Sequence, residues 1–237
     1  MFARAMLCMP QNKISHGLWA AVAAFALFPS FHAIVKLLSS HYSIFQLMAY
    51  MSLAALFPVA LMLLYARRQG RIRIARPGMV LMRAVISGLM AVCVFYALSK
   101  LPMSTAYSVQ FSGPLFAAGL STVVLGEKVG WKRWIGIAVG FCGILIILRP
   151  GITHFNTGYL ASLAVAVLFA CNAMILRTVG GGEPGGALVA AHVVGILGFS
   201  LPMLPSVYIE PDWPDLGWMF VTGLLMSSGH FFLVQAL

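Results

Sequence analysis

Apolar runs long enough to cross a bilayer recur along nearly the whole of this 237-residue chain. A helix needs about 20 mostly apolar residues to cross the hydrocarbon core. With 61% hydrophobic and 8% charged residues, the chain has too little polar surface to cover a soluble globule. The runs are continuously apolar, which favours helices over a β-barrel. We therefore predict an all-α polytopic transmembrane bundle with eight spans, at Gly17–Leu38, Ile44–Tyr65, Met79–Ser99, Ser104–Leu125, Trp134–Leu148, Gly158–Ile175, Ala187–Val207 and Leu216–Leu237.

The chain has a formal net charge of +10. The distribution of its basic residues between the two sides of the membrane indicates what this charge is for. If the N-terminus is cytoplasmic, twelve basic residues lie on the inner side and three, Lys36, Lys100 and Arg149, on the outer side. This asymmetry follows the positive-inside rule and favours a topology anchor over a nucleic-acid patch for the run RRQGRIRIAR. The prediction is a multi-pass protein of the inner (plasma) membrane, with these inner-side residues: Arg4, Lys13, Arg67, Arg68, Arg71, Arg73, Arg76, Arg83, Lys128, Lys132, Arg133 and Arg177.

The cysteines and the N-terminus give no sign of secretion or of a metal site. Cys93, Cys142 and Cys171 fall within predicted spans and Cys8 stands alone near the start, so neither a disulfide framework nor a zinc spacing is present. The first sixteen residues have no apolar core, and the run after them is too long for a signal peptide. We expect residues 1–16 to form a cytoplasmic segment and the first helix to be retained.

An internal repeat relates the two halves of the chain. The run from Gly17 aligns without gaps to the run from Gly158 with six identities in twenty-two positions. Lys36 is aligned with Arg177. The next helices continue the correspondence, with GLMAVCVFYAL opposite SSGHFFLVQAL. Because the first unit, residues 17–150, has five spans, the second unit, which starts at residue 158, has inverted topology.

The second unit stops at Leu237, opposite Leu98 of the first unit. The first unit continues from residue 98 to residue 150, so about fifty residues would be needed to complete the second. We expect residues 158–237 to be a second repeat truncated after three helices. Reading the coding DNA past Leu237 tests this expectation: two further apolar helices with a second GE step would support it, whereas a stop codon would indicate either a decayed gene or completion by a second copy in a homodimer.

The stretch LPMSTAYSVQFSGPLFAAGLSTVVLGEKVGWKRWIGIAVGFCGILIILRPG, Leu101 to Gly151, carries a family resemblance. A short outer turn, a helix broken by Pro114, an LGE step, a glycine-rich helix and an RPG exit follow one another as in EamA-type transporters of the drug/metabolite transporter superfamily. The resemblance extends over residues 17–237. It implies ten helices in two inverted repeats, and transport of small metabolites, commonly export, without a bound cofactor.

Pro114 interrupts a predicted span and leaves the carbonyl of Gln110 without its usual donor. Tyr107, Gln110, Pro114 and Ser121 share one helical face by their spacing. This face is predicted to line a substrate cavity. A purely structural kink, with Gln110 bonded to a neighbouring helix, is the alternative reading.

Polar residues near the middle of other helices are further cavity candidates. His32, Asn172 and His230 lie in three different spans, and Ser227 precedes His230 by one turn. Buried polar groups in lipid need partners or a wet cavity. They are predicted to contact a polar substrate, with a histidine as a proton site, or to hold the bundle together by hydrogen bonds between helices.

The remaining charges favour structural roles. All five acids, Glu127, Glu183, Glu210, Asp212 and Asp215, fall at helix ends or in loops, which excludes an intramembrane carboxylate relay within these spans. Glu127 is predicted to order an inner loop. Lys36 and Arg177 are predicted to extend to the headgroups at opposite faces.

The resulting hypothesis is a transporter that moves a small polar or amphipathic metabolite outward by alternating access between its repeats. Its partners are the metabolite and the lipid bilayer, with no nucleic acid. Import of a vitamin- or nucleoside-like compound is the alternative direction. An intramembrane serine protease, suggested by Ser112 in FSGP and by His192 and His230, lacks the Gly-x-Ser-Gly pattern because Gln110 stands first. A metal-dependent enzyme would need acids where the chain has none.

Overall fold

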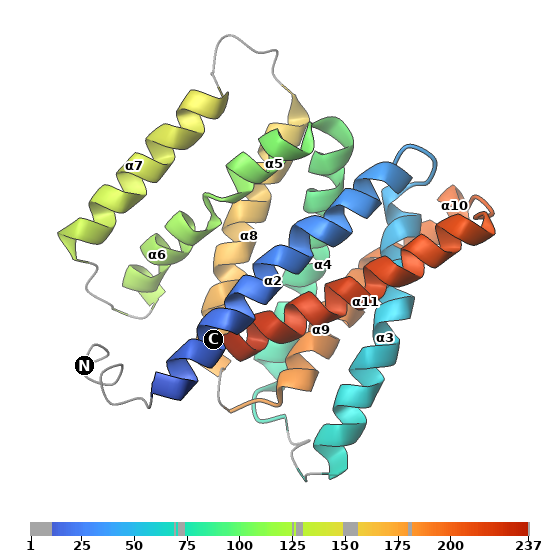
Figure 1. The fold of residues 1–237 in the computed structure, drawn as a ribbon, viewed down its shortest axis with the longest axis horizontal. Coiled ribbons are helices and arrows are strands. Elements are labelled where there is room, and N and C mark those ends of the chain that lie inside the picture. The colour runs from blue at the N-terminus through green and yellow to red at the C-terminus, as the bar shows by residue number, and fades with distance from the viewer. Residues whose placement is uncertain are drawn as a thin grey trace.

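The computed structural model describes residues 11–68, 70, 74–124, 126, 130–148, 156–179 and 182–236, and these residues form helices and short connections without a strand (Figure 1). The all-helical prediction is confirmed. The elements are α2 (Gln11–Leu38), α3 (Ile44–Arg68), α4 (Pro77–Lys100), α5 (Met103–Gln110), α6 (Gly113–Val124), α7 (Trp131–Leu148), α8 (Thr157–Val179), α9 (Gly185–Ser200), the 3-10 turn η1 (Leu201–Met203), α10 (Leu204–Val207) and α11 (Trp213–Ala236).

Six of the eight predicted spans are helices long and apolar enough to cross a membrane, which makes the chain a multi-pass membrane protein. The other two differ from the prediction. The expected span Ser104–Leu125 is divided into α5 and α6, and the span expected from Trp134 to Leu148 lies within the 18-residue helix α7, Trp131–Leu148. The six long spans are Gly17–Leu38, Ile44–Arg68, Pro77–Lys100, Thr157–Val179, Gly185–Val207 and Trp213–Ala236.

Three sequence features lie wholly or partly outside the described residues. These are residues 1–10, the step Leu125–Glu127 apart from Gly126, and the exit Arg149–Gly151. Helix α2 begins at Gln11, so residues 11–16, expected as part of a separate N-terminal segment, extend the first helix.

Hydrogen bonds between loops join the two halves of the chain at both ends of the bundle. At one end, the Tyr42 hydroxyl donates to Asp215 at 2.8 Å and accepts from the Asp212 N–H at 3.3 Å. The bond to Asp215 raises the pKa of the Tyr42 phenol. At the other end, Glu183 accepts from the Arg76 N–H at 2.6 Å. We call these ends the Tyr42 face and the Arg76 face.

The packing of the long helices follows a regular pattern. Helix α2 lies along α11, α8 lies along α4, and α9 packs on α4 while α3 packs on α11 (Figure 1). Suppose that α2, α3 and α4 of the first unit correspond to α8, α9 and α11 of the second. The contact of α2 with α11 then corresponds to that of α8 with α4, and the contact of α3 with α11 corresponds to that of α9 with α4. The contact of α3 with α9 joins two equivalent helices. This is the pattern that two inverted repeats would produce, and the repeat remains a prediction that the packing supports.

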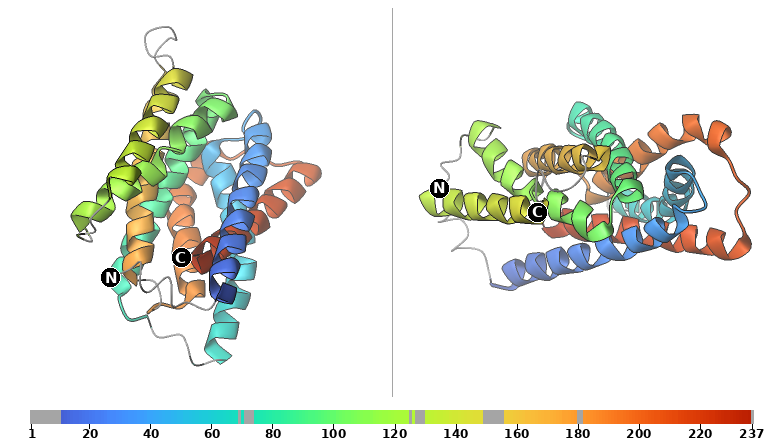
Figure 2. Two further views of the ribbon diagram at one scale, coloured as in Figure 1. Left: turned by 60° about the vertical axis from the view of Figure 1, so that its left-hand side comes forward. Right: turned by 90° about the horizontal axis from the view of Figure 1, so that it is seen from above.

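Helix α7 lies at the edge of the bundle beside α5 and α6 (Figure 2). Its outer side chains, among them Trp131, Val139 and Ile146, are exposed. An apolar face of this kind suits contact with lipid tails, because a helix in a bilayer does not have to bury its apolar side chains against protein.

Glycines permit two close helix crossings. A Cβ at Gly195 of α9 would collide with the carbonyl group of Ala84 in α4. A Cβ at Gly223 of α11 would collide with the carbonyl oxygen of Met51 in α3. Since backbone atoms cannot move aside as side chains can, these two positions require glycine for the observed interhelical distance.

Replacing Gly195 with alanine should therefore destabilise the bundle by about 1–3 kcal/mol, because α9 and α4 must separate. Gly198 lies one turn further along the same helix, and a Cβ there meets no atom within 4 Å. Gly198→Ala should be neutral or stabilising by up to about 1 kcal/mol. Thermal unfolding of the purified variants in detergent measures both; equal unfolding temperatures would contradict the close crossing.

Candidate functional site

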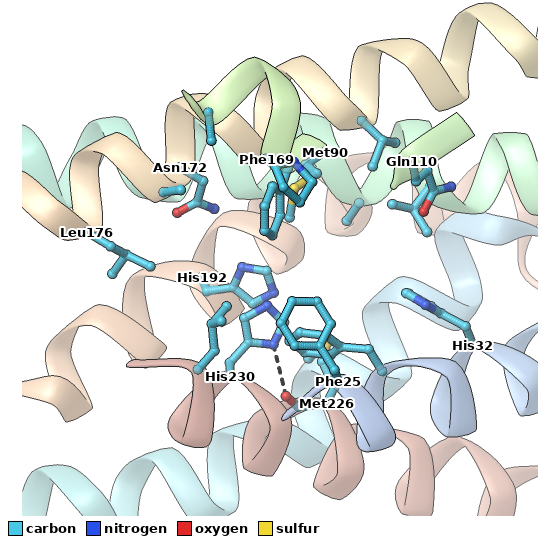
Figure 3. A pocket seen from close by; sticks show the side chains of 18 of the residues that line it. Phe25, His32, Met90, Gln110, Phe169, Asn172, Leu176, His192, Met226 and His230 are labelled. Carbon is cyan, nitrogen blue, oxygen red and sulfur yellow. Dashed lines mark hydrogen bonds between the residues drawn. The ribbon is translucent and has the colours of Figure 1, made fainter. Parts of the chain in front are cut away.

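A cavity of about 580 Å³ lies in the centre of the bundle, between α2, α4, α5, α6, α8, α9 and α11. Aromatic and aliphatic side chains form most of its wall, with a few polar side chains between them (Figure 3). Six of the seven predicted cavity residues line it: His32, Tyr107, Gln110, Pro114, Asn172 and His230. The seventh, Ser227, lies outside the lining, where its hydroxyl donates to the Leu224 carbonyl at 3.0 Å.

The break between α5 and α6 brings irregular backbone to the cavity wall. The chain leaves the helix at Phe111 and Ser112, just before Pro114. The sequence predicts a bend here, but the helix ends and a new one begins, because proline offers no N–H to the preceding turn. The Gln110 side chain lies at this break, where its Nε2 is buried and has no hydrogen-bond partner in the described structure. Such an atom is suited to binding a ligand or water in the cavity.

Ser121, predicted to share the face of Gln110, lies elsewhere. It is buried, outside the cavity lining, and donates to the Ala118 carbonyl at 2.9 Å. The cavity lining continues past the break at Pro114, Ala117 and Ala118 of α6, but it does not reach Ser121.

One polar group of the cavity lies toward the Tyr42 face. His32 Nδ1 and the Tyr107 hydroxyl share a hydrogen bond between α2 and α5. Phe31 and Phe95 surround the imidazole, with ring centroids 4.1 and 6.1 Å from it. Beyond this pair, Lys36 Nζ donates to the carbonyls of Leu98 and Leu101 at the end of α4. The Lys36 side chain thus bonds to another helix. The sequence had instead predicted that it would extend to the lipid headgroups.

A second polar group lies toward the Arg76 face. Arg83, Asn172, His192 and His230 are each six or seven positions from the Arg76-face end of α4, α8, α9 and α11, respectively. At 1.5 Å per residue they lie about 10 Å along their helices from that end. Arg83 Nη1 donates to Asn172 Oδ1, and Asn172 Nδ2 donates to Ser87 Oγ at 3.2 Å. Four separate helices therefore contribute to one polar layer.

The two histidines of this layer are stacked. The rings of His192 and His230 are 3.5 Å apart at the centroids and inclined by 26° (Figure 3). His230 Nδ1 contacts the Met226 carbonyl oxygen at 2.9 Å, which makes Nδ1 the protonated nitrogen. His192 Nδ1 is buried without a hydrogen-bond partner in the described structure.

Sequence reasoning missed two residues of this layer. Arg83 was counted as an inner-loop charge, yet it is fully buried within α4. Its position inside the apolar run Met79–Ser99 was the available signal, since loop charges lie outside such runs. His192 was considered only as a protease histidine, although its place within an apolar span marks it equally as a cavity residue.

The serine protease alternative finds no support in the site. Ser112 is buried and its hydroxyl donates to the Val109 carbonyl at 2.6 Å. It lines a separate pocket between α6, α7 and α8, apart from the histidines of the central cavity. Among the described residues, no group of three or more His, Cys, Asp or Glu side chains is placed to hold a metal ion.

A helical bundle that crosses the membrane repeatedly, around a mostly apolar central cavity with a few polar side chains, defines the class of this protein, a multi-pass membrane protein with an internal cavity. Residues 14–149 match the EamA-like transporter family, and the chain belongs to this family.

Several relatives are transporters with different substrates. The chain is 31% identical over 141 residues to an S-adenosylmethionine uptake transporter of Rickettsia prowazekii, which covers 60% of this chain and 48% of the relative. It is 24% identical over 235 residues to the pseudopaline exporter CntI of Pseudomonas aeruginosa, covering 96% and 80%. It is 28% identical over 128 residues to a riboflavin transporter of Vibrio cholerae, covering 54% and 41%. The alignment to the Rickettsia protein spans about half of that relative's length.

Thiol labelling checks the cavity assignment. In a background in which the native cysteines are replaced by alanine, Ala173→Cys places a thiol on the cavity lining, and Ser227→Cys places one outside it. A polar methanethiosulfonate reagent should modify the first several times faster than the second, because only the first borders space that water can enter. Equal rates for the two would contradict the assignment.

Proposed function

We propose that this chain moves a small polar or amphipathic metabolite across the membrane and that the central cavity binds this metabolite. The observation that carries the proposal is the cavity itself, in which polar groups from six helices border an aromatic wall. A mixed lining of this kind suits a ligand that has both polar and apolar parts. Membership of the EamA-like transporter family and the transporters among the relatives support it.

We further propose that the Arg76 face is cytoplasmic, in the inner membrane of the cell. The excess of basic residues on this side supports that orientation. The cavity lining extends to the last turns of two helices at this face, with Leu176, Arg177, Leu233 and Ala236. Between His32 and the Tyr42 face, the hydrogen bonds of Lys36 hold α2 against the end of α4. These bonds favour closure of the cavity on that side. This conformation is suited to accept a metabolite from the cytoplasm, and alternation between the inverted repeats would release it on the other side.

Export is the direction we propose, and the pseudopaline exporter is a relative that aligns with most of this chain. Import is the second candidate. The S-adenosylmethionine uptake transporter supports it, and that name fits the nucleoside-like substrate class considered from the sequence. In both directions we expect the same cavity to bind the substrate.

Reconstitution of the purified chain in liposomes tests transport, with radiolabelled S-adenosylmethionine and riboflavin as the first probes in each direction. We expect protein-dependent flux of one of them. Absence of flux for both probes, from protein that retains its helical circular dichroism spectrum, would contradict the proposal as applied to this chain.

Two substitutions test the role of the cavity. Gln110→Ala and His230→Ala each remove one cavity side chain that can bond to substrate, so flux should fall about tenfold. Membrane insertion should be unchanged. Ser227→Ala, outside the lining, is the matched control and should retain flux. Normal flux in both cavity variants would exclude these two residues from substrate binding.

A further inference from the structure

Arg83 is a fully buried cation whose hydrogen-bonding capacity is only partly used. Its Nε donates to the Leu188 carbonyl at 2.9 Å and its Nη1 donates to Asn172 Oδ1. Its Nη2 is buried and has no partner in the described structure. These bonds fix the guanidinium between α8 and α9. Among the described residues the Nη2 amino group has no partner, and Arg83 lines the cavity.

No negative charge compensates Arg83 within the described part of the chain. Both of its acceptors are uncharged, and the acids Glu183, Glu210, Asp212 and Asp215 all lie at the membrane faces. A buried charge is costly unless it is paired. Because an unpaired guanidinium in an apolar bundle is unfavourable, a bound anion would supply the missing counter-charge.

The surroundings of Arg83 favour an anion as the ligand. Arg83, His192 and His230 belong to the same polar layer, and all three line the cavity. The unpartnered His192 Nδ1 belongs to the same layer. Carboxylate and phosphate groups each present two oxygens that match the fork of donors of arginine better than neutral groups do.

We propose that Arg83 binds the oxyanionic group, carboxylate or phosphate, of a small organic compound, and that the apolar part of this compound lies against the aromatic wall formed by Phe28, Phe95 and Phe169. This inference rests on the proposed function and narrows its substrate class to amphipathic compounds that carry a carboxylate or phosphate group. Of the two flux probes, S-adenosylmethionine carries a carboxylate and riboflavin carries neither group. Asn172 is a positioning residue, because it orients the guanidinium through Nη1. In a merely structural role, Arg83 would only hold α8 and α9 together, and its loss would change stability without changing ligand preference.

Binding of matched compounds to the purified chain in detergent distinguishes these roles. The pairs are indole-3-acetate with indole-3-acetamide, nicotinate with nicotinamide, and adenosine monophosphate with adenosine. Each pair compares an oxyanion with a neutral analogue; the first two pairs test a carboxylate and the third tests a phosphate. We expect the anionic member of at least one pair to raise the unfolding temperature more than its neutral partner. No anion preference in any pair would overturn the proposal.

Arg83→Gln should weaken binding of the preferred anion at least about tenfold and remove the preference, because a hydrogen-bonded charge is lost. Arg68→Gln, an exposed arginine at the end of α3, is the matched control and should retain it. A preference that survives in Arg83→Gln would overturn the proposal. Asn172→Asp provides an independent variant if Arg83→Gln fails to fold, because the new carboxylate would neutralise Arg83 internally and should also remove the preference.

The flux assay separates this inference from the transport proposal. Anion-selective, Arg83-dependent binding without flux would retain the anion site and contradict transport. Flux of neutral compounds that is unchanged in Arg83→Gln would retain transport and contradict the anion site.

Discussion

Lipid tails cannot hydrogen bond to the peptide backbone, and the rest of this structure depends on that constraint. It explains why the described residues are almost entirely helical, and why non-helical backbone is confined to the membrane faces and to one internal place. That place is the break at Phe111 and Ser112 between α5 and α6, which borders the cavity at Gln110. Irregular backbone at membrane depth is tolerated where it is covered by protein or lines a wet space. The break therefore belongs to the same feature as the cavity.

The two polar groups of the cavity are held in different ways. His32 and Tyr107 bond to each other, so this pair can remain satisfied when no ligand is present. The layer around Arg83 has a network through Asn172 and Ser87, yet Arg83 Nη2 and His192 Nδ1 remain without partners in the described structure. Buried polar atoms without partners are unusual in native proteins. Two such atoms lie in this one layer, which distinguishes it from the self-sufficient pair on the other side; the others in the described structure are Ser52 Oγ, Gln110 Nε2 and Ser162 Oγ.

Hydropathy predicted most of the fold, because a bilayer imposes a fixed length on each spanning helix. It failed where one proline converted a predicted span into two short helices. Six of the seven cavity residues could be found because a polar group within an apolar span is conspicuous. Ser227 lies outside the lining, and sequence alone could not show this, since a serine bonded to its own helix gives the same sequence signal as one that faces a cavity. Arg83 was missed because charge was counted by loop, and only the packing of α4 against α8 and α9 reveals its burial.

The loop contacts at Tyr42 and Glu183 have a kinetic consequence. Each joins the first half of the chain to the second, one at each membrane face, and both are formed in the same conformation. In the transport cycle proposed above, any further separation of the halves at one face would have to break the contact at that face, while the contact at the other face would serve as the pivot. The strengths of two small hydrogen-bonded contacts would then set the barriers of the two opposing strokes, and with them the turnover rate and the time spent facing each side.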